Sequence, residues 1–370
     1  MNPILNYLKN LFAAERIVGD DAHLKGLLQA DALLTNLIES GKVPGLAIKV
    51  QKEGKTIFQK GYGFADLEQK TRVDPQRTIF RVASISKPIA ATALAIMVQD
   101  GLIDLDTSFY QYVPYYPKKR WDFTIRQLAG HTAGIRSYQG KEYGLNEPYG
   151  IKDSLVIFQE DDLLFEPGRG YLYTSYDWVL ISLAMQEASG IPFEQYVREN
   201  VLDPLGMKNT FAPKHPKRET MQTVDSDMEV SKNTASFYSK AVAGFKKAIP
   251  VNNYYKLAGG GYLATAEDIV KFGRAYLDGK LLSAAMRSQF LTSQRVLDKP
   301  TYYGLGWQVS EDAQGRKFYG HVGNGVGGYS NLFVYPEQQM VFSILINCTD
   351  PKIQQEVDAI INLFLKQKTF

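Results

Sequence analysis

Hydrophobic and polar positions follow two different periods at the N-terminal end of the chain. Residues 22–42 place Leu27, Leu34 and Ile38 on one face and stop at Gly41, a pattern that predicts a helix with a glycine end signal. Residues 45–66 (GLAIKVQKEGKTIFQKGYGFAD) then form two strand-like runs around Glu53-Gly54. This second pattern predicts a β-hairpin.

The C-terminal end repeats the same two patterns in the opposite order. Residues 303–323 and 328–347 contain strand-like runs separated by turn signals, and residues 350–368 have the spacing of a closing helix. We therefore expect both ends of the chain to build one antiparallel sheet.

The middle of the chain has helical spacing, with glycine and proline marking the loops. Five segments carry this spacing: 84–101, 124–130, 176–189, 192–202 and 265–278. The economical topology is an insertion of helices into a sheet domain. We predict an α+β fold with a discontinuous sheet subdomain (1–75 plus 255–370), a mainly helical subdomain (76–254) and an active site at their junction. Residues 212–255 are polar and weakly periodic, which indicates a long loop.

Composition narrows the class of protein. Of 370 residues, 45% are hydrophobic and 22% charged, and the net charge is +3, so nothing indicates a nucleic-acid partner or an acidic membrane surface. Cys348 is the single cysteine and ends an apolar run, so an internal disulfide is excluded and a small packed side chain is expected. The sequence leaves the oligomeric state undetermined.

The N-terminal stretch does not have the pattern of a secretory signal. Asn6, Lys9 and Asn10 interrupt its apolar residues before a signal-peptide core of sufficient length develops. No run approaches the ~20 apolar residues of a membrane span. We expect a soluble protein in the cytoplasm, or an exported one if a leader has been removed.

The candidate chemistry begins with Ser84 and Lys87. An i, i+3 pair lies on one helix face, so the Lys87 amine can reach the Ser84 hydroxyl at the positive end of the helix dipole, an arrangement that activates a nucleophile. The alternative is an N-cap serine beside a solvated lysine, which Pro88 in the first turn suits equally. These residues alone leave both interpretations open.

Two further triplets favour the catalytic interpretation. Tyr173-Thr174-Ser175 precedes a predicted helix, and His321-Val322-Gly323 ends a predicted strand. With Ser84-x-x-Lys87 they resemble the signature of the serine beta-lactamase and penicillin-binding protein family: Ser-x-x-Lys, Tyr-x-Asn, then Lys-Thr-Gly or His-x-Gly. The chain is most similar to the class C branch with its esterases and D-amino peptidases, and within it to mitochondrial serine beta-lactamase-like proteins and their bacterial relatives.

The resemblance extends along most of the chain, from Val43-Pro44-Gly45 to about Asn347. It includes SISK, GLIDLDTSFYQYVPYYP, RQLAGHTAGIRSY, FEPG, DPLGMKNT and AGGGYLATAEDIVKF, in the family's order. It implies a beta-lactamase/transpeptidase-like fold and a serine hydrolase that works without a cofactor on a small-molecule or short-peptide substrate.

Carried over residue by residue, the resemblance implies a set of roles. Ser84 would be the acylated nucleophile, Lys87 its partner and Tyr173 the phenol that transfers the proton. His321 and Gly323 would stand on the strand beside the cleft, and the backbone N–H groups of Ser84 and Asn324 would form the oxyanion hole. Whether Lys87 or Tyr173 is the general base stays open, because the two groups titrate as a coupled set.

Two positions depart from the family pattern. Ser175 stands where the class C pattern has asparagine, and His321, mostly neutral at pH 7, stands where many members have a lysine that pairs with the antibiotic's carboxylate. Both changes favour peptide, amide or ester hydrolysis over beta-lactam turnover. Arg136, in the aromatic loop IRSYQGKEYGLNEPYG, is the candidate for the missing anion contact, against the alternative of an ordinary surface loop.

Other matches are better explained by structure. Tyr329-Ser330-Asn331 also spells Tyr-x-Asn but falls inside a strand run, and His131 precedes a glycine turn, where we expect the backbone to satisfy it. Gly259-Gly260-Gly261 lacks the lysine of a phosphate loop and predicts a turn before a capped helix. The four histidines have no metal-ligand spacing.

The sequence is compatible with two functions. The first is an acyl-enzyme serine hydrolase. The second, which the resemblance also allows, is a non-catalytic or self-assembling scaffold that keeps the fold. The joint presence of Ser84, Lys87 and Tyr173 favours the enzyme, because a scaffold has no need of all three.

Overall fold

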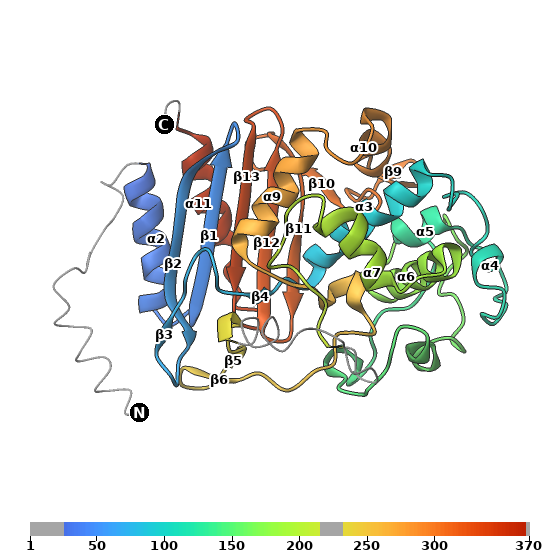
Figure 1. The fold of residues 1–370 in the computed structure, drawn as a ribbon, viewed down its shortest axis with the longest axis horizontal. Helices are drawn as coiled ribbons and strands as arrows, with labels where there is room; N and C mark the ends of the chain where they lie inside the picture. The colour runs from blue at the N-terminus through green and yellow to red at the C-terminus, as the bar shows by residue number, and fades with distance from the viewer. Residues whose placement is uncertain (1–25, 215–231, 368–370) are drawn as a thin grey trace.

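A seven-stranded antiparallel sheet organises the computed structural model of the protein, which describes residues 26–214 and 232–367 (Figure 1). Its strand order is β10-β11-β12-β13-β1-β2-β3. The strands are β1 (Gly45–Lys52), β2 (Lys55–Asp66), β3 (Thr71–Arg72), β10 (Gln308–Glu311), β11 (Lys317–Gly325), β12 (Gly328–Tyr335) and β13 (Met340–Ile346). The β1–β2 hairpin and the pairing of β1 with β13 confirm that both chain ends build one sheet.

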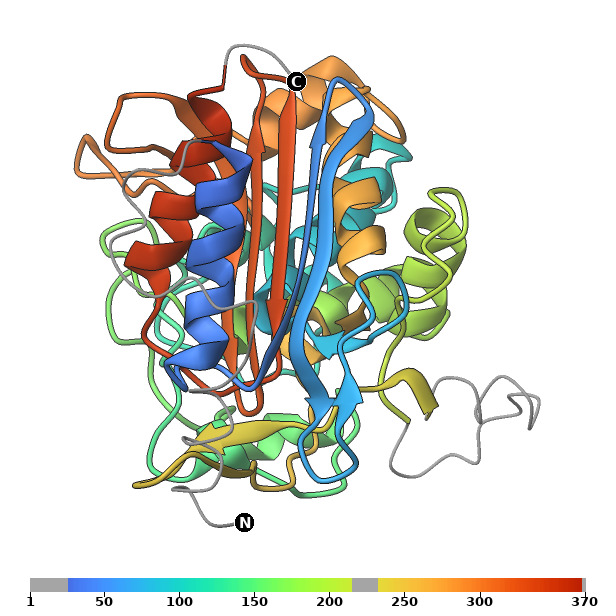
Figure 2. The same cartoon turned by 90° about the vertical axis from the view of Figure 1, so that its left-hand side faces the viewer.

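Helices cover both faces of this sheet because successive side chains of each strand point to opposite faces, and both faces are apolar. Ile48 and Val50 of β1 belong to the core under α2 (Leu27–Glu39) and α11 (Gln354–Leu365), which lie side by side on one face (Figure 2). The buried Lys49 points to the opposite side, where it forms an ion pair with Glu267 of α9 (Ala266–Leu277). The period of two in the sequence thus fixes which helix each strand position meets.

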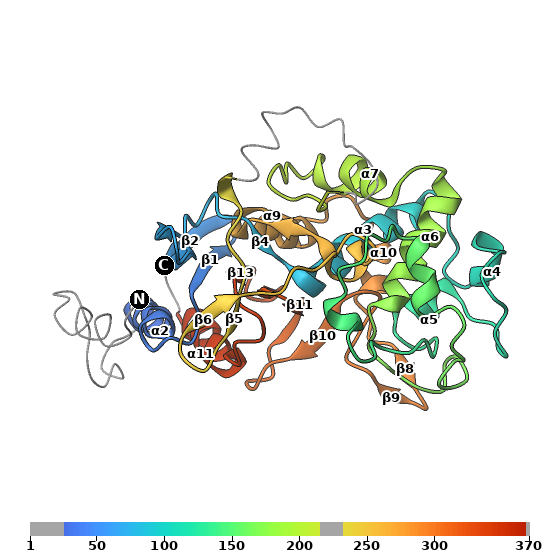
Figure 3. The ribbon, with the colours of Figure 1, turned by 90° about the horizontal axis from the view of Figure 1, so that it is seen from below.

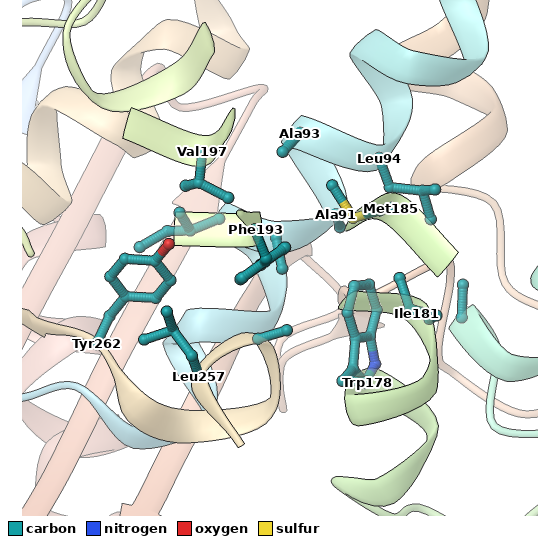
Figure 4. Packing of buried hydrophobic residues seen from close by; sticks show 14 of the residues in the cluster. Ala91, Ala93, Leu94, Trp178, Ile181, Met185, Phe193, Val197, Leu257 and Tyr262 are labelled. Atoms are coloured by element: carbon teal, nitrogen blue, oxygen red, sulfur yellow. The ribbon is translucent and has the colours of Figure 1, made fainter. Parts of the chain in front are cut away.

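The mainly helical half packs around α3 (Ser86–Gln99) and α6 (Tyr176–Ser189), beside the β10–β11 edge of the sheet (Figure 1). Ala91 and Leu94 of α3 face Trp178 and Met185 of α6 in one apolar cluster (Figure 4). Both helices are apolar on nearly all sides, so the half has a buried centre. Its other helical segments are α4 (Phe109–Tyr112), α5 (Ile125–Ala129), η2 (Glu142–Gly144), η3 (Asp153–Ile157), α7 (Phe193–Val197) and η4 (Arg198–Leu202).

The predicted helices differ from the observed ones mainly at their ends. Residues 83–85 form a short 3₁₀ turn, η1 (Ala83–Ile85), before α3, and the segment 192–202 divides into α7 and the π-helical turn η4. Helix α5 begins at a capping box between Thr124 and Gln127. The later segments are η5 (Leu257–Gly261), β7 (Leu263–Ala264), which pairs with β4 (Phe80–Arg81), α10 (Ala284–Phe290) and the β8–β9 pair (Arg295–Val296, Lys299–Pro300).

The segment predicted as a long loop is more ordered than expected where the structure describes it. Residues 238–247 form a hairpin of β5 (Tyr238–Lys240) and β6 (Phe245–Lys247) at one end of the sheet strands (Figure 3). Tyr238 bridges to Cys348, and backbone pairing of this kind overrides the weak periodicity of the segment. Residues 215–231, and the N-terminal stretch used to judge a leader, lie outside the described residues.

Cys348 is a free thiol with no exposed surface, as the sequence predicted. Across residues 26–214 and 232–367, no helix is both long enough and apolar enough to cross a membrane. The subdomain boundaries at residues 75 and 255 stay a prediction.

Truncating the helical core should destabilise the protein far more than truncating its surface. Leu94 has no exposed surface, whereas Leu102, just beyond the same helix, is 44% exposed. We expect Leu94→Ala to lower the free energy of unfolding by about 2–5 kcal/mol, and Leu102→Ala to lower it by less than about 1 kcal/mol. Urea unfolding followed by circular dichroism measures both. Equal losses would contradict the assignment of α3 to the core.

Candidate active site

Ser84 lies in the η1 turn, where the backbone is strained. Ala83, the preceding residue, has φ 44°, in the left-handed region that a side chain disfavours. Val82 donates its N–H to Tyr262 O at 3.1 Å, and Tyr262 N–H donates to Ser86 Oγ at 3.1 Å, so the glycine-rich turn η5 holds this segment on both sides of the serine. The strain is therefore maintained by fixed neighbours, and it presents a half-buried Ser84.

Lys87 has no exposed surface, and its amine contacts three oxygens from three segments. The Nζ atom lies 3.3 Å from Ser84 Oγ, 3.2 Å from Ser175 Oγ and 2.6 Å from Gly259 O. Among the described residues no carboxylate forms an ion pair with it. Gly259 must be a glycine, because a Cβ there would lie 2.9 Å from Ser175 Cβ.

Tyr173 completes the group around the serine hydroxyl. Its hydroxyl donates to Ser84 Oγ at 2.8 Å, and the Lys87 Nζ atom lies 4.6 Å from the centre of its ring. The structure therefore brings together Ser84, Lys87, Tyr173 and Ser175, four of the residues selected from the sequence. The Ser84 hydroxyl is therefore within hydrogen-bond distance of the Tyr173 hydroxyl, which donates to it, and of the Lys87 amine.

Burial separates the protonation states of the two candidate bases. Desolvation lowers the pKa of Lys87 to about 7, assisted by the nearby charge of Lys256 and opposed by Asp177. Desolvation raises the pKa of Tyr173 well above its usual value, against the hydrogen bond with Ser84. At neutral pH the lysine is thus the group that can release its proton, and the tyrosine keeps its own.

Gly323 is the point where strand β11 comes closest to the backbone of Ser84. A Cβ at this position would lie 2.5 Å from Val82 O, 2.2 Å from Ser330 Oγ and 3.0 Å from Ser84 N. Only glycine permits this approach, which gives a physical reason for the last residue of His-x-Gly. The next residue, Asn324, is exposed and lines the same cavity as Ser84.

His321 stands on β11 but is buried behind the site. It is 1% exposed; its Nδ1 lies 2.7 Å from Val322 O and its Nε2 lies 3.0 Å from the Tyr303 hydroxyl. A carbonyl can only accept, so Nδ1 carries the proton and Nε2 accepts from Tyr303. Desolvation and the charge of Lys87 lower the pKa of His321 to about 3, so the ring is neutral.

His131 has a partner that the sequence did not reveal. Its Nδ1 lies 2.6 Å from Asp177 Oδ2, with the two side chains 0% and 1% exposed, so the expectation of backbone partners alone was wrong. Desolvation lowers the pKa of His131 and raises that of Asp177, so burial disfavours the charged form of each side chain. The centre of the imidazole ring lies 4.6 Å from that of the Tyr173 ring and 4.8 Å from that of Tyr303, so His131 packs against the phenol that contacts Ser84.

Arg136 lies away from the cavity. Its guanidinium donates to Asp161 Oδ2 at 2.6 Å, to Glu142 at 2.7 and 3.0 Å and to Ile157 O at 2.8 Å. These bonds use its donors to hold the loop that carries Glu142. The structure therefore does not place Arg136 where it could meet a substrate anion, because its guanidinium forms ion pairs with two neighbouring carboxylates.

The second Tyr-x-Asn triplet is a strand segment, as predicted. Tyr329, Ser330 and Asn331 lie in β12, where Ser330 Oγ donates to Val82 O at 2.6 Å. The triple glycine precedes a helix capped by Thr265, again as predicted. What the sequence did not indicate is that this turn supplies the Gly259 carbonyl to Lys87.

A cavity opens beside Ser84 and contains two further cations that sequence reasoning missed. Its lining includes Ser84, Ser175, Asn324, Arg81 and Lys256. The sequence contained a signal for Lys256, because this residue interrupts the run NNYYKLAGGG. A charged side chain is unusual in such an apolar setting and indicates a specific role. Asp177 had no such signal, because an acidic residue in the first helical turn is ordinary.

Comparison with known proteins gives a consistent result. A sequence model of the family described as Beta-lactamase matches residues 30–365. The human mitochondrial serine beta-lactamase-like protein LACTB is 26% identical over 407 aligned positions, which cover 83% of this chain and 71% of that protein.

Solved structures show the same fold. The octameric penicillin-binding protein homologue from Pyrococcus abyssi superposes with a TM-score of 0.77 and 22% identity, covering 91% of this chain and 77% of that one. The D-amino acid amidase from Ochrobactrum anthropi superposes with a TM-score of 0.75 and 21% identity, covering 92% and 99%. The predicted beta-lactamase/transpeptidase-like fold is confirmed.

The close approach at Gly323 predicts a specific sensitivity of strand β11. Gly323→Ala should lower the free energy of unfolding by about 1–3 kcal/mol, because its methyl group meets backbone and a buried hydroxyl. Gly325→Ala, in the same strand, meets only Ala83 Cβ at 3.2 Å and should cost less. Thermal and urea unfolding compare the two. A larger loss for Gly325→Ala would refute the packing described here.

Proposed function

The chain belongs to the beta-lactamase family, and from that premise we propose that it hydrolyses an amide or ester bond through an acyl-enzyme on Ser84. The observation that carries this proposal is the convergence on Ser84 Oγ of the Tyr173 hydroxyl at 2.8 Å and the Lys87 amine at 3.3 Å. A serine hydroxyl needs an adjacent base to become an effective nucleophile. The two groups supply a base and an acid.

Lys87 acts as the base in acylation. Neutral Lys87 donates to Gly259 O and Ser175 Oγ, which leaves its lone pair for the Ser84 hydroxyl. As that proton moves to Nζ, Ser84 Oγ bonds to the substrate carbonyl carbon and the carbonyl oxygen takes the negative charge. Its pKa of about 7 suits this step, because a base near the operating pH is both free and strong enough.

Tyr173 delivers a proton to the leaving group. Collapse of the tetrahedral intermediate breaks the bond to the leaving nitrogen or oxygen, which takes the Tyr173 proton, and the proton that Lys87 took from Ser84 then restores the phenol. Water then attacks the acyl carbon, with Lys87 again as the base, and releases the acid. Each cycle consumes one water and leaves the enzyme unchanged.

The developing oxyanion is held by the backbone N–H groups of Ser84 and Asn324. Their proximity is supported by the packing of Gly323 against Ser84 N and by the shared cavity of Ser84 and Asn324. Each such donor contributes about 3 kcal/mol to transition-state stabilisation.

The substrate is an amide or ester with an acyl part small enough for the cavity, and a beta-lactam is a poor one. Ser175 offers a hydroxyl to Lys87 and no amide to the substrate, and neutral His321 provides no fixed charge on β11. A non-catalytic scaffold is the competing function, and it is decided by the labelling experiment that follows.

Labelling with a fluorophosphonate tests the nucleophile. The reagent forms a P–O bond to Ser84 Oγ and loses fluoride, so intact mass and peptide mapping should place one adduct on Ser84. Ser84→Ala should abolish the adduct. Ser288→Ala, at an exposed serine of α10 away from the cavity, is the control and should still label. A folded wild-type protein that gives no adduct would contradict the enzyme and favour the scaffold.

The pH dependence tests the base. Because protonated Lys87 cannot accept the Ser84 proton, kcat/KM for a p-nitrophenyl ester should fall as pH drops through about 7 and level off above it. Lys256 lowers the pKa of Lys87, so Lys256→Met should move this acid limb to higher pH. An acid limb near pH 3 would instead match His321 and contradict the role of Lys87.

A further inference from the structure

Two cationic side chains line the cavity beside the nucleophile, and the mechanism above uses neither of them. Arg81 comes from the short strand β4, just before the η1 turn, and Lys256 immediately precedes the η5 turn. Tyr138, Tyr143 and Asn253 complete this side of the cavity. Two segments that hold the catalytic groups therefore also bring positive charge next to Ser84.

Lys256 is buried although its charge is poorly compensated. It is 7% exposed, its Nζ donates to Tyr143 O at 3.1 Å, and the rings of Tyr138, Tyr143 and Tyr255 lie 5.1–5.8 Å from it. A lysine amine has three donors, and only one has a protein acceptor here. Burying an ammonium without a counter-charge is costly, so the position calls for an anionic partner.

Arg81 shows the same lack of a counter-charge. It donates from Nη1 to Val326 O at 2.7 Å and its guanidinium lies 4.1 Å from the centre of the Phe237 ring. Across the part of the chain that the structure describes, no carboxylate forms an ion pair with Arg81 or Lys256. Arg136, which is as deeply buried as Lys256, has two carboxylate partners. The contrast distinguishes a structural arginine from cations that face a cavity.

The two charges also disfavour each other. Desolvation lowers the pKa of Lys256 to about 8, with the charge of Arg81 as a second cause, and desolvation lowers that of Arg81 to about 10. Both side chains stay largely protonated at neutral pH. An anion between them would relieve the repulsion and supply the missing acceptors.

We propose that Arg81 and Lys256 form a binding subsite for a carboxylate carried by the acyl part of the substrate. The inference rests on the proposed hydrolase function and names its substrate class: esters or amides of acids that bear a second, anionic carboxylate. Lys256 supplies a point charge and Arg81 a planar donor group, and together they orient the acyl chain toward Ser84.

The subsite lies on the acyl side because the proton donor lies on the other side. Tyr173 must reach the leaving group, and its ring packs with His131, Tyr303 and His321. None of these four side chains lines the cavity that contains Arg81 and Lys256. Because the leaving group must meet the Tyr173 hydroxyl, the cavity with the two cations is left to the acyl part of the substrate, and the carboxylate stays with the acyl-enzyme.

Paired esters test this inference directly. Mono-4-nitrophenyl esters of adipate, pimelate and suberate each carry a free carboxylate, and their methyl-capped counterparts are neutral. Wild-type protein should show a higher kcat/KM for the anionic member at one chain length, with Ser84→Ala giving the background rate. Lys256→Met should reduce the anionic-to-neutral ratio roughly 10- to 100-fold, the usual effect of losing a hydrogen bond to a charged group.

The anionic-to-neutral ratio of kcat/KM separates recognition of the carboxylate from the hydrolysis step itself. Any effect of Lys256 on the pKa of Lys87 acts on both esters alike and cancels. Lys256→Arg should restore a large part of the ratio. Lys246→Met removes an exposed lysine of β6 outside the cavity and should leave the ratio as in wild type. An unchanged ratio in Lys256→Met, with both esters hydrolysed, would overturn the subsite and leave the hydrolase proposal intact.

A binding measurement separates the two proposals when turnover is absent. Calorimetric titration of Ser84→Ala with monomethyl pimelate should show binding that dimethyl pimelate lacks and that Lys256→Met removes. Such binding by a protein that neither hydrolyses esters nor labels with fluorophosphonate would support the subsite and overturn the hydrolase. Equal titrations with the two esters would overturn the subsite.

Discussion

The burial of the Lys87 amine is the interaction on which the rest of the site depends. Three segments that are far apart in the sequence meet at this one nitrogen: the η1 turn through Ser84, the start of α6 through Ser175 and the η5 turn through Gly259. Among the described residues no carboxylate forms an ion pair with it, so desolvation outweighs the opposing charge of Asp177 and lowers the lysine pKa to about 7. The same packing that excludes water thus also sets the chemistry.

The surroundings of Lys87 are arranged so that few other full charges share its interior. His321 is neutral and held by Val322 O and Tyr303, and burial disfavours charge on both His131 and Asp177 behind Tyr173. A free carboxylate in these positions would raise the lysine pKa and hold it protonated. The buried histidines therefore add aromatic packing around Lys87 without adding a counter-charge.

The sequence predicted the sheet, its helices and the contact between Ser84 and Lys87 because those features depend on local pattern. The hairpin at Glu53-Gly54, the cap at Thr265 and the spacing of Ser84 and Lys87 all depend on residues within a few positions of each other. The resemblance to a known family added Tyr173, which no local pattern links to Ser84.

What the sequence did not predict depends on contacts between distant segments. Asp177 meets His131 across 46 positions, and Gly259 reaches Lys87 across 172. Arg136 and Lys256 are two further residues whose roles the sequence did not predict. The arginine had the setting of a substrate contact and is held by Glu142 and Asp161, while the lysine stood beside a glycine turn and lines the cavity. Only the folded chain shows which cation has carboxylate neighbours.

Positive charge is distributed unevenly around Ser84. Neutral His321 occupies the strand position where a lysine would hold an anion, so the aromatic side around Tyr173 and Tyr303 has no fixed cation of its own. Positive charge lies instead at Arg81 and Lys256, on segments that also position Ser84 and Lys87. If Tyr173 delivers the proton as proposed, a substrate anion held by the cations would keep the leaving group next to the Tyr173 hydroxyl. Binding of the anion in the cavity and proton delivery by a side chain outside its lining would then fix the orientation of the scissile bond over Ser84.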